Sequence, residues 1–215
     1  MNLTPDSFSD GGKFKKRSLG YKQAALLFRH GANIVDVGGE STRPGSKAVK
    51  TKVEWNRISS TIKKFSKKIV LSLDTRKSEI MEKGIKIGVK LINDVSGLKY
   101  DKKSINVLKK YNTPFVIHHI QGTPTTMQIN PKYKNVLFDI YDFFEERIKY
   151  VRLNGIKQNN IIIDPGIGFG KNLKHNMKLI SIFLFFIALV FLYCLEYLEK
   201  DLLKIFLEKM IANKD

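Results

Sequence analysis

Five polar motifs hold the side chains of this sequence that are best suited to chemistry, and each follows a short apolar run. They supply aspartate, asparagine, threonine and arginine, with glycines beside them. Such groups can exchange hydrogen bonds with a ligand, and a guanidinium suits an anionic phosphate. A chain that repeats this pattern builds one polar site from several loops. The motifs are TPDSFSDGG (4–12), GGESTRPGS (38–46), DTRKS (74–78), NDVSG (93–97) and DPGIGFGK (164–171).

The apolar runs before these motifs are short and rich in β-branched residues, which is typical of strands. We interpret each as a strand that is buried on both faces of a parallel sheet. Residues 1–3 are too short for a whole strand, so we expect the chain to begin inside its first strand, giving about six strands. The other five runs are 34–37, 69–73, 91–92, 115–117 and 161–163.

Longer segments with helical spacing separate the runs, and their apolar stripes predict core-facing helix positions. This alternation of strand, loop and helix predicts an α/β fold of the TIM (βα)8 type. Asn135 to Leu153 is the clearest helix. The stripes comprise Tyr21, Ala24, Leu27 and Phe28; Trp55, Ile58 and Ile62; and Leu137, Ile140, Tyr141, Phe144 and Ile148.

The bulk composition limits the classes of function. A net charge of +18 could indicate an anionic partner, but the lysines are scattered and form no compact stripe. We therefore favour a lysine-rich surface, and we expect no nucleic-acid partner because no nucleic-acid module is recognisable. The single cysteine, Cys194, allows no intrachain disulfide, and the N-terminus lacks a signal-peptide pattern. Both features favour a cytoplasmic protein.

The motifs resemble the dihydropteroate synthase family over roughly residues 2–177. TPDSFSDGG together with ESTRPG is the most specific part, and DTRKS, INDVSG and DPGIGFGK follow in the family's order. The resemblance implies a TIM barrel that condenses p-aminobenzoate with 6-hydroxymethyl-7,8-dihydropterin pyrophosphate. The products would be 7,8-dihydropteroate and pyrophosphate, an early step of folate biosynthesis, and Mg2+ would assist.

The resemblance also implies roles for three strand-end residues, Asp74, Asn93 and Asp164, as contacts to the pterin. The ring presents an amide and amidine edge, which needs hydrogen-bond acceptors for its N–H groups. Taken singly, each residue could instead cap a helix or turn. Their occurrence in this order favours a binding site, with Asp74 and Asp164 counted among the catalytic groups.

The pyrophosphate leaving group implies a second set of residues. Asn2 matches the family position associated with Mg2+ and pyrophosphate, and Thr42 and Arg43 lie in the second loop. Arg43 is the third expected catalytic residue, because departure of pyrophosphate builds negative charge that a cation stabilises. We expect a loose, carbocation-like displacement in which the arylamine attacks afterwards.

The first two loops carry the remaining expected site residues. Phe8 and Pro44 match family positions that wall the p-aminobenzoate pocket, and Asp6 could pair with Arg43 as a latch between the loops. The alternative is two mobile surface loops built from turn residues.

Two other motifs resemble functional sites but do not predict one. His118 and His119 are adjacent, so they point to opposite faces of a strand, and no cysteine or histidine with ligand spacing supports a zinc site. GIGFGK lacks the spacing of a phosphate-binding P-loop.

The resemblance ends near Lys171. The family implies two further βα units with Ser-Arg-Lys and Arg-x-His motifs, and neither occurs here. We therefore divide the chain into an incomplete barrel, 1–178, and an aberrant helical tail, 179–215. The tail holds an apolar run, 179–195. It could be a frame-altered translation, which we favour, a membrane helix, or a buried helix.

These expectations describe a family member truncated at both ends. An open barrel exposes backbone groups and apolar side chains, so we expect poor solubility and little or no activity for this chain. The alternatives are a pterin-binding methyltransferase domain and a non-catalytic pterin-binding pseudo-enzyme. Family members form homodimers, but the helices of that interface are missing here, so the oligomeric state stays open.

Overall fold

The computed structural model describes residues 1–4 and 13–181, in which strands and helices alternate. The strands are β1 (Ile34–Gly38), β2 (Val70–Asp74), β3 (Leu91–Asp94), β4 (Phe115–His118) and β5 (Ile161–Asp164). The helices are α1 (Lys13–Arg29), α2 (Thr51–Phe65), α3 (Ser78–Lys86), α4 (Ser104–Tyr111), α5 (Val136–Leu153) and α6 (Leu173–Ser181), with a short 3-10 helix, η2 (Gln158–Asn160).

All five strands are parallel and lie in the order β1-β2-β3-β4-β5. The prediction of a parallel α/β fold from five apolar runs is confirmed. Ahead of β1, Asn2 forms an isolated parallel bridge with Gly38, and the Leu3 amide donates to the Gly38 carbonyl at 2.8 Å. The expected first strand is therefore represented by this bridge alone.

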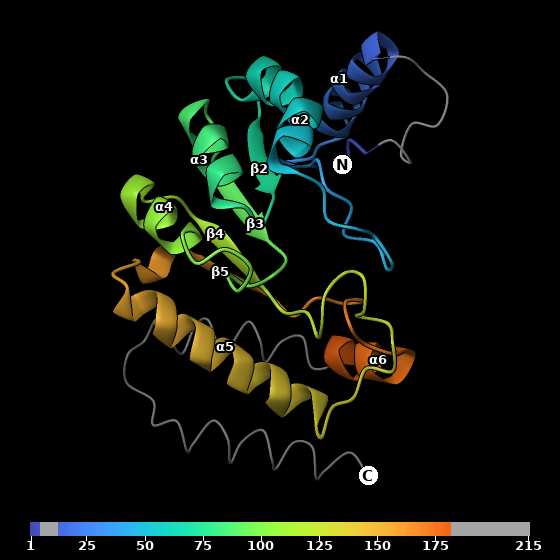
Figure 1. Ribbon diagram of the computed structural model, residues 1–215, viewed down its shortest axis with the longest axis vertical. Coiled ribbons are helices and arrows are strands. Elements are labelled where there is room, and N and C mark those ends of the chain that lie inside the picture. The colour runs from blue at the N-terminus through green and yellow to red at the C-terminus, as the bar shows by residue number, and fades with distance from the viewer. Residues whose placement is uncertain (5–12, 182–215) are drawn as a thin grey trace.

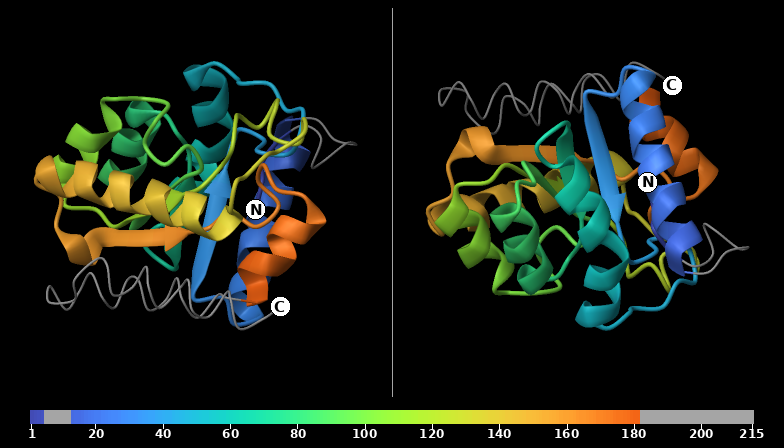
Figure 2. Two further views of the ribbon diagram at one scale, coloured as in Figure 1. Left: turned by 90° about the horizontal axis from the view of Figure 1, so that it is seen from below. Right: turned by 90° about the horizontal axis from the view of Figure 1, so that it is seen from above.

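The helices cover one face of a strongly twisted sheet. Helices α2, α3 and α4 lie along the same side in Figure 1, and the end-on views of Figure 2 show how far the direction of β5 has turned from that of β1. Side chains that alternate along the strands fill the space between sheet and helices. The largest of those that are fully buried are Leu71, Leu73, Ile92, Phe115 and Ile117.

The expectation that the strands are buried on both faces is confirmed for most of β2 and β4 but is wrong at the exposed ends of β1 and β2 and for β5. Ile34, Val70 and Ile162 point to the face opposite the helices, and they are 50%, 44% and 45% exposed. A strand of a parallel sheet is buried on both faces only where a second layer covers it. In the described ranges, 1–4 and 13–181, helices supply that layer on one side. On the other face Ser72, Asp74 and His118 are buried, whereas Ile34, Val70 and Ile162 remain accessible.

The predicted helix stripes are confirmed with one exception. Ile58, Ile62, Ile140 and Phe144 are fully buried. Phe28 is 49% exposed, because in the last turn of α1 it is Leu27 that packs against the core. Spacing identifies the apolar face of a helix, but a residue near the end is buried only if a neighbouring element extends that far.

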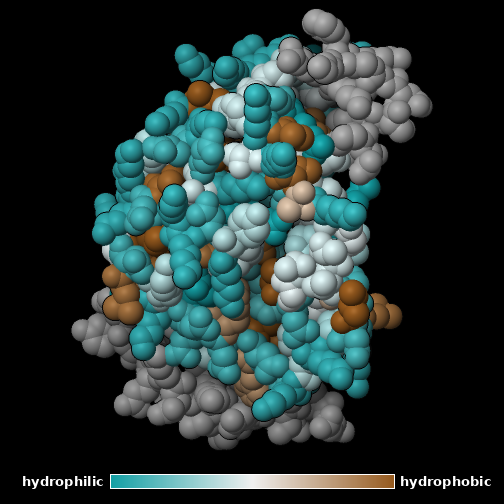
Figure 3. Space-filling model, viewed as in Figure 1, coloured by the Kyte–Doolittle hydropathy of each residue, from teal (hydrophilic) through white to brown (hydrophobic). Residues whose placement is uncertain are grey.

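The tail predictions fall mostly on residues 182–215, which lie outside the described part of the chain. Helix α6 (Leu173–Ser181) continues across the expected boundary at residue 178. Among the helices in residues 13–181, none combines the length and the apolar character needed to cross a membrane. The face seen in Figure 3 is mainly hydrophilic, with apolar residues scattered over it, as expected for a chain of net charge +18.

Candidate functional site

The register of the sheet brings the predicted strand-end residues to one edge. Asn2, Gly38, Asp74 and Asn93 are neighbours in successive strands and form one continuous row. Asp164 lies at the end of β5, paired with His118 of β4, at the level above that row. The carboxyl ends of parallel strands share one edge, and in βα proteins that edge carries the ligand site.

Gly38 marks the point where Asn2 and Asp74 converge. A Cβ atom on Gly38 would lie 2.9 Å from Asn2 Oδ1 and 3.0 Å from Asp74 Oδ2. Both oxygens therefore border a space that exists because residue 38 has no side chain. Two hard oxygen atoms around this space can accept hydrogen bonds or coordinate a small cation.

Asp36 also lies at this site, although it was not among the predicted site residues. Asn93 Nδ2 donates to Asp36 Oδ2 at 3.4 Å. Among the described residues, Asp36 Oδ1 and Asn93 Oδ1 are buried and accept no hydrogen bond. Buried acceptors without donors are rare, so these two oxygens are available to N–H groups of a ligand. A charged residue between two buried valines in the run IVDVG was the signal available in the sequence.

The electrostatics of Asp74 reflect its crowded position. Burial raises the pKa of its carboxyl well above the ordinary value, and the negative charges of Asp36, Glu54 and Asp94 raise it further. In such surroundings the protonated form of the carboxyl is favoured, because burial and neighbouring negative charges both oppose ionisation. A ligand that brings hydrogen-bond donors would stabilise the ionised form.

Asp164 is more accessible and is held by its own loop. Its Oδ1 accepts from the Gly166 amide at 2.8 Å, and His118 Nε2 lies 3.9 Å from Oδ2. The side chain of Asp164 is 47% exposed. The His118 ring packs edge-on against Phe169, with ring centroids 4.5 Å apart. The second oxygen of Asp164 thus remains accessible to a ligand.

The loop after β5 is fixed by a buried lysine. Lys171 Nζ donates to the carbonyls of Gly166 and Phe169, both at 2.9 Å, and lies 3.0 Å from His119 Nδ1. Burial lowers the Lys171 pKa to about 7 and, together with the charge of Lys171, lowers the His119 pKa to about 3. His119 is therefore neutral, and its Nδ1 accepts a hydrogen bond from Lys171 Nζ. In the part of the chain that the structure describes, no cluster of metal-ligating side chains occurs.

The loop after β1 carries the other predicted ligand contacts. Thr42 is partly buried, and Arg43 and Pro44 are exposed. The loop is tied to the segment after β4, because the Gly45 amide donates to the Pro124 carbonyl at 2.9 Å and Thr125 Oγ1 donates to the Ser46 carbonyl at 2.9 Å. Its position at the same edge makes Arg43 available to a ligand. Asp6 and Phe8 lie outside the described residues, so the latch and the p-aminobenzoate wall stay predictions.

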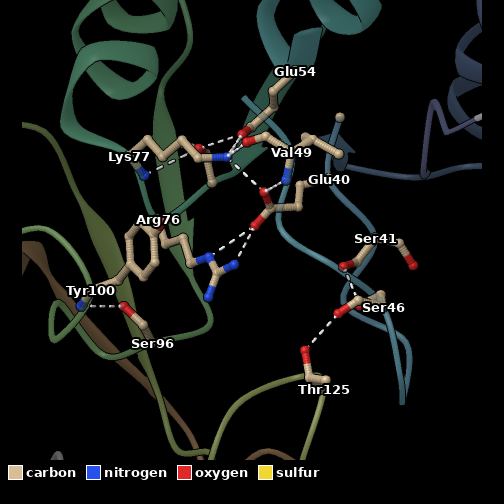
Figure 4. A network of polar contacts seen from close by, with 12 residues as sticks. Glu40, Ser41, Ser46, Val49, Glu54, Arg76, Lys77, Ser96, Tyr100 and Thr125 are labelled. Atoms are coloured by element: carbon tan, nitrogen blue, oxygen red, sulfur yellow. Dashed lines mark hydrogen bonds and ion pairs between the residues drawn. The ribbon is translucent and has the colours of Figure 1, made fainter. Parts of the chain in front are cut away.

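A buried network of charges supports this loop from below (Figure 4). Glu40, at the start of the loop, binds Arg76 and Lys77, the two residues that follow Thr75 after β2. Lys77 also binds Glu54 of α2, and Thr75 Oγ1 donates to Glu54 Oε1 at 2.6 Å. These residues were not among the predicted site residues, because nothing in the local sequence pattern pairs a glutamate with a lysine 37 positions later.

The matching family model is that of pterin-binding enzymes, and it covers residues 1–186. The chain belongs to this family. Its curated relatives include dihydropteroate synthases. The enzyme of Clostridium beijerinckii is 42% identical over 180 residues, and that of Escherichia coli is 38% identical over 183 residues. The alignments cover 83% and 84% of this chain but 64% of each relative, so the chain spans less than two thirds of their length.

Solved structures of dihydropteroate synthases share the fold. A Yersinia pestis enzyme in complex with a sulfonamide drug matches with a TM-score of 0.77 and 36% identity, over 84% of this chain and 66% of that one. A Clostridium difficile enzyme in the presence of pteroic acid matches with a TM-score of 0.77 and 38% identity, over 84% and 67%. A Xanthomonas albilineans enzyme with 4-aminobenzoic acid matches with a TM-score of 0.77 and 35% identity, over 84% of this chain and 64% of that one. The pterin-binding enzyme fold therefore extends over most of the chain.

Proposed function

We propose that this chain carries the pterin- and pyrophosphate-binding part of a dihydropteroate synthase. The substrates would be 6-hydroxymethyl-7,8-dihydropterin pyrophosphate and p-aminobenzoate. The observation that supports this most is the row of Asn2, Asp74 and Asn93 at the carboxyl edge, with Asp164 one level above. The relatives' names and bound molecules, pteroic acid and 4-aminobenzoic acid, point to the same chemistry.

The pterin ring fits the unmet acceptors of this edge. The buried oxygens of Asp36 and Asn93 that accept no hydrogen bond within residues 1–4 and 13–181 match the N–H groups of an amidine edge. Asp74 and the accessible oxygen of Asp164 supply further acceptors, and a carboxylate can take two parallel N–H donors. In this role the four residues orient the ring, and their oxygens accept hydrogen bonds from its N–H groups.

Pyrophosphate would lie toward Asn2 and the loop with Thr42 and Arg43. Mg2+ takes few protein oxygens and binds substrate phosphates for the rest, so Asn2 Oδ1 next to Asp74 Oδ2 is a suitable donor set. When bound, the ion would neutralise charge on the departing phosphate oxygens. Arg43, exposed on its loop, provides a planar guanidinium that can pair with two phosphate oxygens.

The reaction exchanges one bond for another. The bond from the pterin methylene carbon to the pyrophosphate oxygen breaks, and the electron pair leaves with the pyrophosphate. The arylamine nitrogen then forms the new bond to carbon and releases one proton to solvent. In this sequence Asp74, Asn93 and Asp164 hold the ring while Arg43 stabilises the leaving group.

Calorimetry with the full chain tests the assignment. We expect the pterin pyrophosphate to bind, and Asp164→Ala to weaken binding by roughly tenfold or more, because a charge-assisted acceptor is lost. A product assay on the same samples separates binding from turnover, and binding without product would identify a pseudo-enzyme. If the unmodified chain does not bind the pterin pyrophosphate, the proposed function is wrong.

Arg43→Ala is expected to reduce any measured turnover by two to three orders of magnitude, roughly the effect of removing one preorganised charge donor. Steady-state assays of product formation measure it, with Lys47→Ala as the control because Lys47 is an exposed cation on the same loop. Near-normal turnover by Arg43→Ala would remove Arg43 from the mechanism.

A further inference from the structure

Lys77 contacts both ends of the loop that carries the expected phosphate-binding residues. We call residues 40–49 the Arg43 loop. Lys77 Nζ donates to Glu40 Oε2 at 2.6 Å, at the start of the loop, and to the Val49 carbonyl at 2.8 Å, at its end. The same ammonium binds the Glu54 carboxylate of α2. One cation thus joins the loop to a helix and to the end of β2 (Figure 4).

Glu40 also joins the two ends of the Arg43 loop. Its Oε2 also accepts from the Val49 amide at 2.8 Å, and its Oε1 accepts from Arg76 Nε at 2.8 Å. The Arg43 loop has no helix or strand of its own, so these contacts take the place of secondary structure. Between the two ends Arg43 is exposed. Hydrogen bonds join Gly45 and Ser46 to Pro124 and Thr125.

The network is buried and electrically balanced. Glu40 and Lys77 are each 8% exposed and Glu54 is 1% exposed, and the four ionic groups are two carboxylates and two cations. Burial would lower the Lys77 pKa, but the hydrogen bonds that Lys77 donates to Glu40 and Glu54 outweigh this effect and raise the pKa. Burial would raise the Glu40 pKa, but its bonds to Lys77 and Val49 lower it. Glu40 and Lys77 therefore stay ionised at neutral pH, and removal of either one leaves its buried partner without a counter-charge.

We infer that Lys77, together with Glu40, is a positioning residue that fixes the Arg43 loop relative to Asp74. Lys77 follows Asp74 by three positions, so one short segment carries the ring contact and the anchor of the loop. The distance between the ring side and the phosphate side of the ligand is thereby set by the network. This inference rests on the proposed function for the identity of the ligand, but the anchoring of the loop can be tested without any ligand.

The test compares Lys77→Met with Lys83→Met. Lys83 is a matched control, because it lies on α3 and pairs with Glu79 at the surface, where ion pairs contribute little. Hydrogen exchange of the peptide 41–49 is measured by mass spectrometry. We expect Lys77→Met to increase the exchange rate of this peptide about tenfold, and Lys83→Met to leave it unchanged.

Calorimetry adds a readout that general destabilisation would not produce. Two ligands are compared: the pterin pyrophosphate and 6-hydroxymethyl-7,8-dihydropterin without the pyrophosphate. Lys77→Met should weaken binding of the first about tenfold or more and leave binding of the second nearly unchanged. If Lys77→Met does not fold, Glu40→Gln is used instead, because it keeps the shape of the acceptor and leaves the pair of Lys77 with Glu54 in place.

The outcomes separate the two proposals. Equal exchange of peptide 41–49 in the two lysine variants, or an equal loss of affinity for both ligands, would overturn the positioning role. If the unmodified chain binds neither ligand, the proposed function fails, and the exchange measurement alone decides whether Lys77 anchors the loop.

Discussion

Gly166→Ala is expected to destabilise the protein by roughly 3 to 5 kcal/mol. Gly166 has a φ of +68°, and a Cβ there would lie 2.1 Å from the His119 carbonyl oxygen and 2.8 Å from the His118 ring. Backbone cannot yield as a flexible side chain does, so the loop after β5 would have to shift away from β4. Because the Gly166 amide holds Asp164, the shift would also disturb the site.

Gly168 in the same loop is the control for backbone conformation alone. Its φ is +84°, but a Cβ at this position meets no atom within 4 Å. Gly168→Ala should therefore cost only about 1 to 2 kcal/mol, the strain of a left-handed conformation. Urea denaturation of the two variants measures the difference. Equal losses would show that the contact with His119 contributes nothing.

Asp74→Asn should change ligand affinity and stability in opposite directions. Loss of the carboxylate removes an acceptor for the pterin, and we expect affinity for the pterin pyrophosphate to fall about a hundredfold. The same change removes a buried negative charge next to Asp36, Glu54 and Asp94, so the free energy of unfolding at neutral pH should rise.

The sign of the pH dependence follows from the raised pKa of Asp74. In the folded protein its carboxyl binds a proton more tightly than in the unfolded chain, where the pKa is near 3.8. The folded state therefore binds more protons once the pH exceeds that value, and stability falls as the pH rises toward the folded pKa. Asp74→Asn should flatten this part of the stability curve, as measured by urea denaturation from pH 4 to pH 8.

Asp101→Asn is the control of opposite sign. Burial would raise the Asp101 pKa, but hydrogen bonds from Ser78 and Lys103 outweigh it and lower the pKa. Its ionised form therefore stabilises the fold above the unfolded pKa, and stability is lost as the pH falls through the folded value. Asp101→Asn should lower the free energy of unfolding at neutral pH and leave pterin binding intact. A loss of stability in Asp74→Asn as well would contradict the account of Asp74.

The strands could be predicted from the sequence because each is a short apolar run, and all except β4 are followed by one of the polar motifs. The neighbouring positions of Asn2, Asp74 and Asn93 could also be predicted from the sequence, because parallel strands place their carboxyl ends at one edge of the sheet. Phe28 was misplaced because burial at the end of a helix depends on which neighbour reaches it.

Long-range pairing limited the rest of the prediction. Glu40 and Lys77 meet only when two βα units are docked, and each looks locally like an ordinary surface residue of a loop. Asp36 was overlooked among apolar neighbours, although strand alternation places it on the same face as Gly38. Contacts between distant segments arise from the assembled fold, and no local pattern encodes them.

The strand order also bears on how the molecule is made. Every strand from β2 onward pairs with the one synthesised just before it, so the sheet can grow in step with the ribosome and needs no late insertion. Asn2, Asp74 and Asn93 would come together early in translation, and Asp164 would join when β5 emerges. The ligand edge is thus assembled in chain order, with its most accessible carboxylate added last.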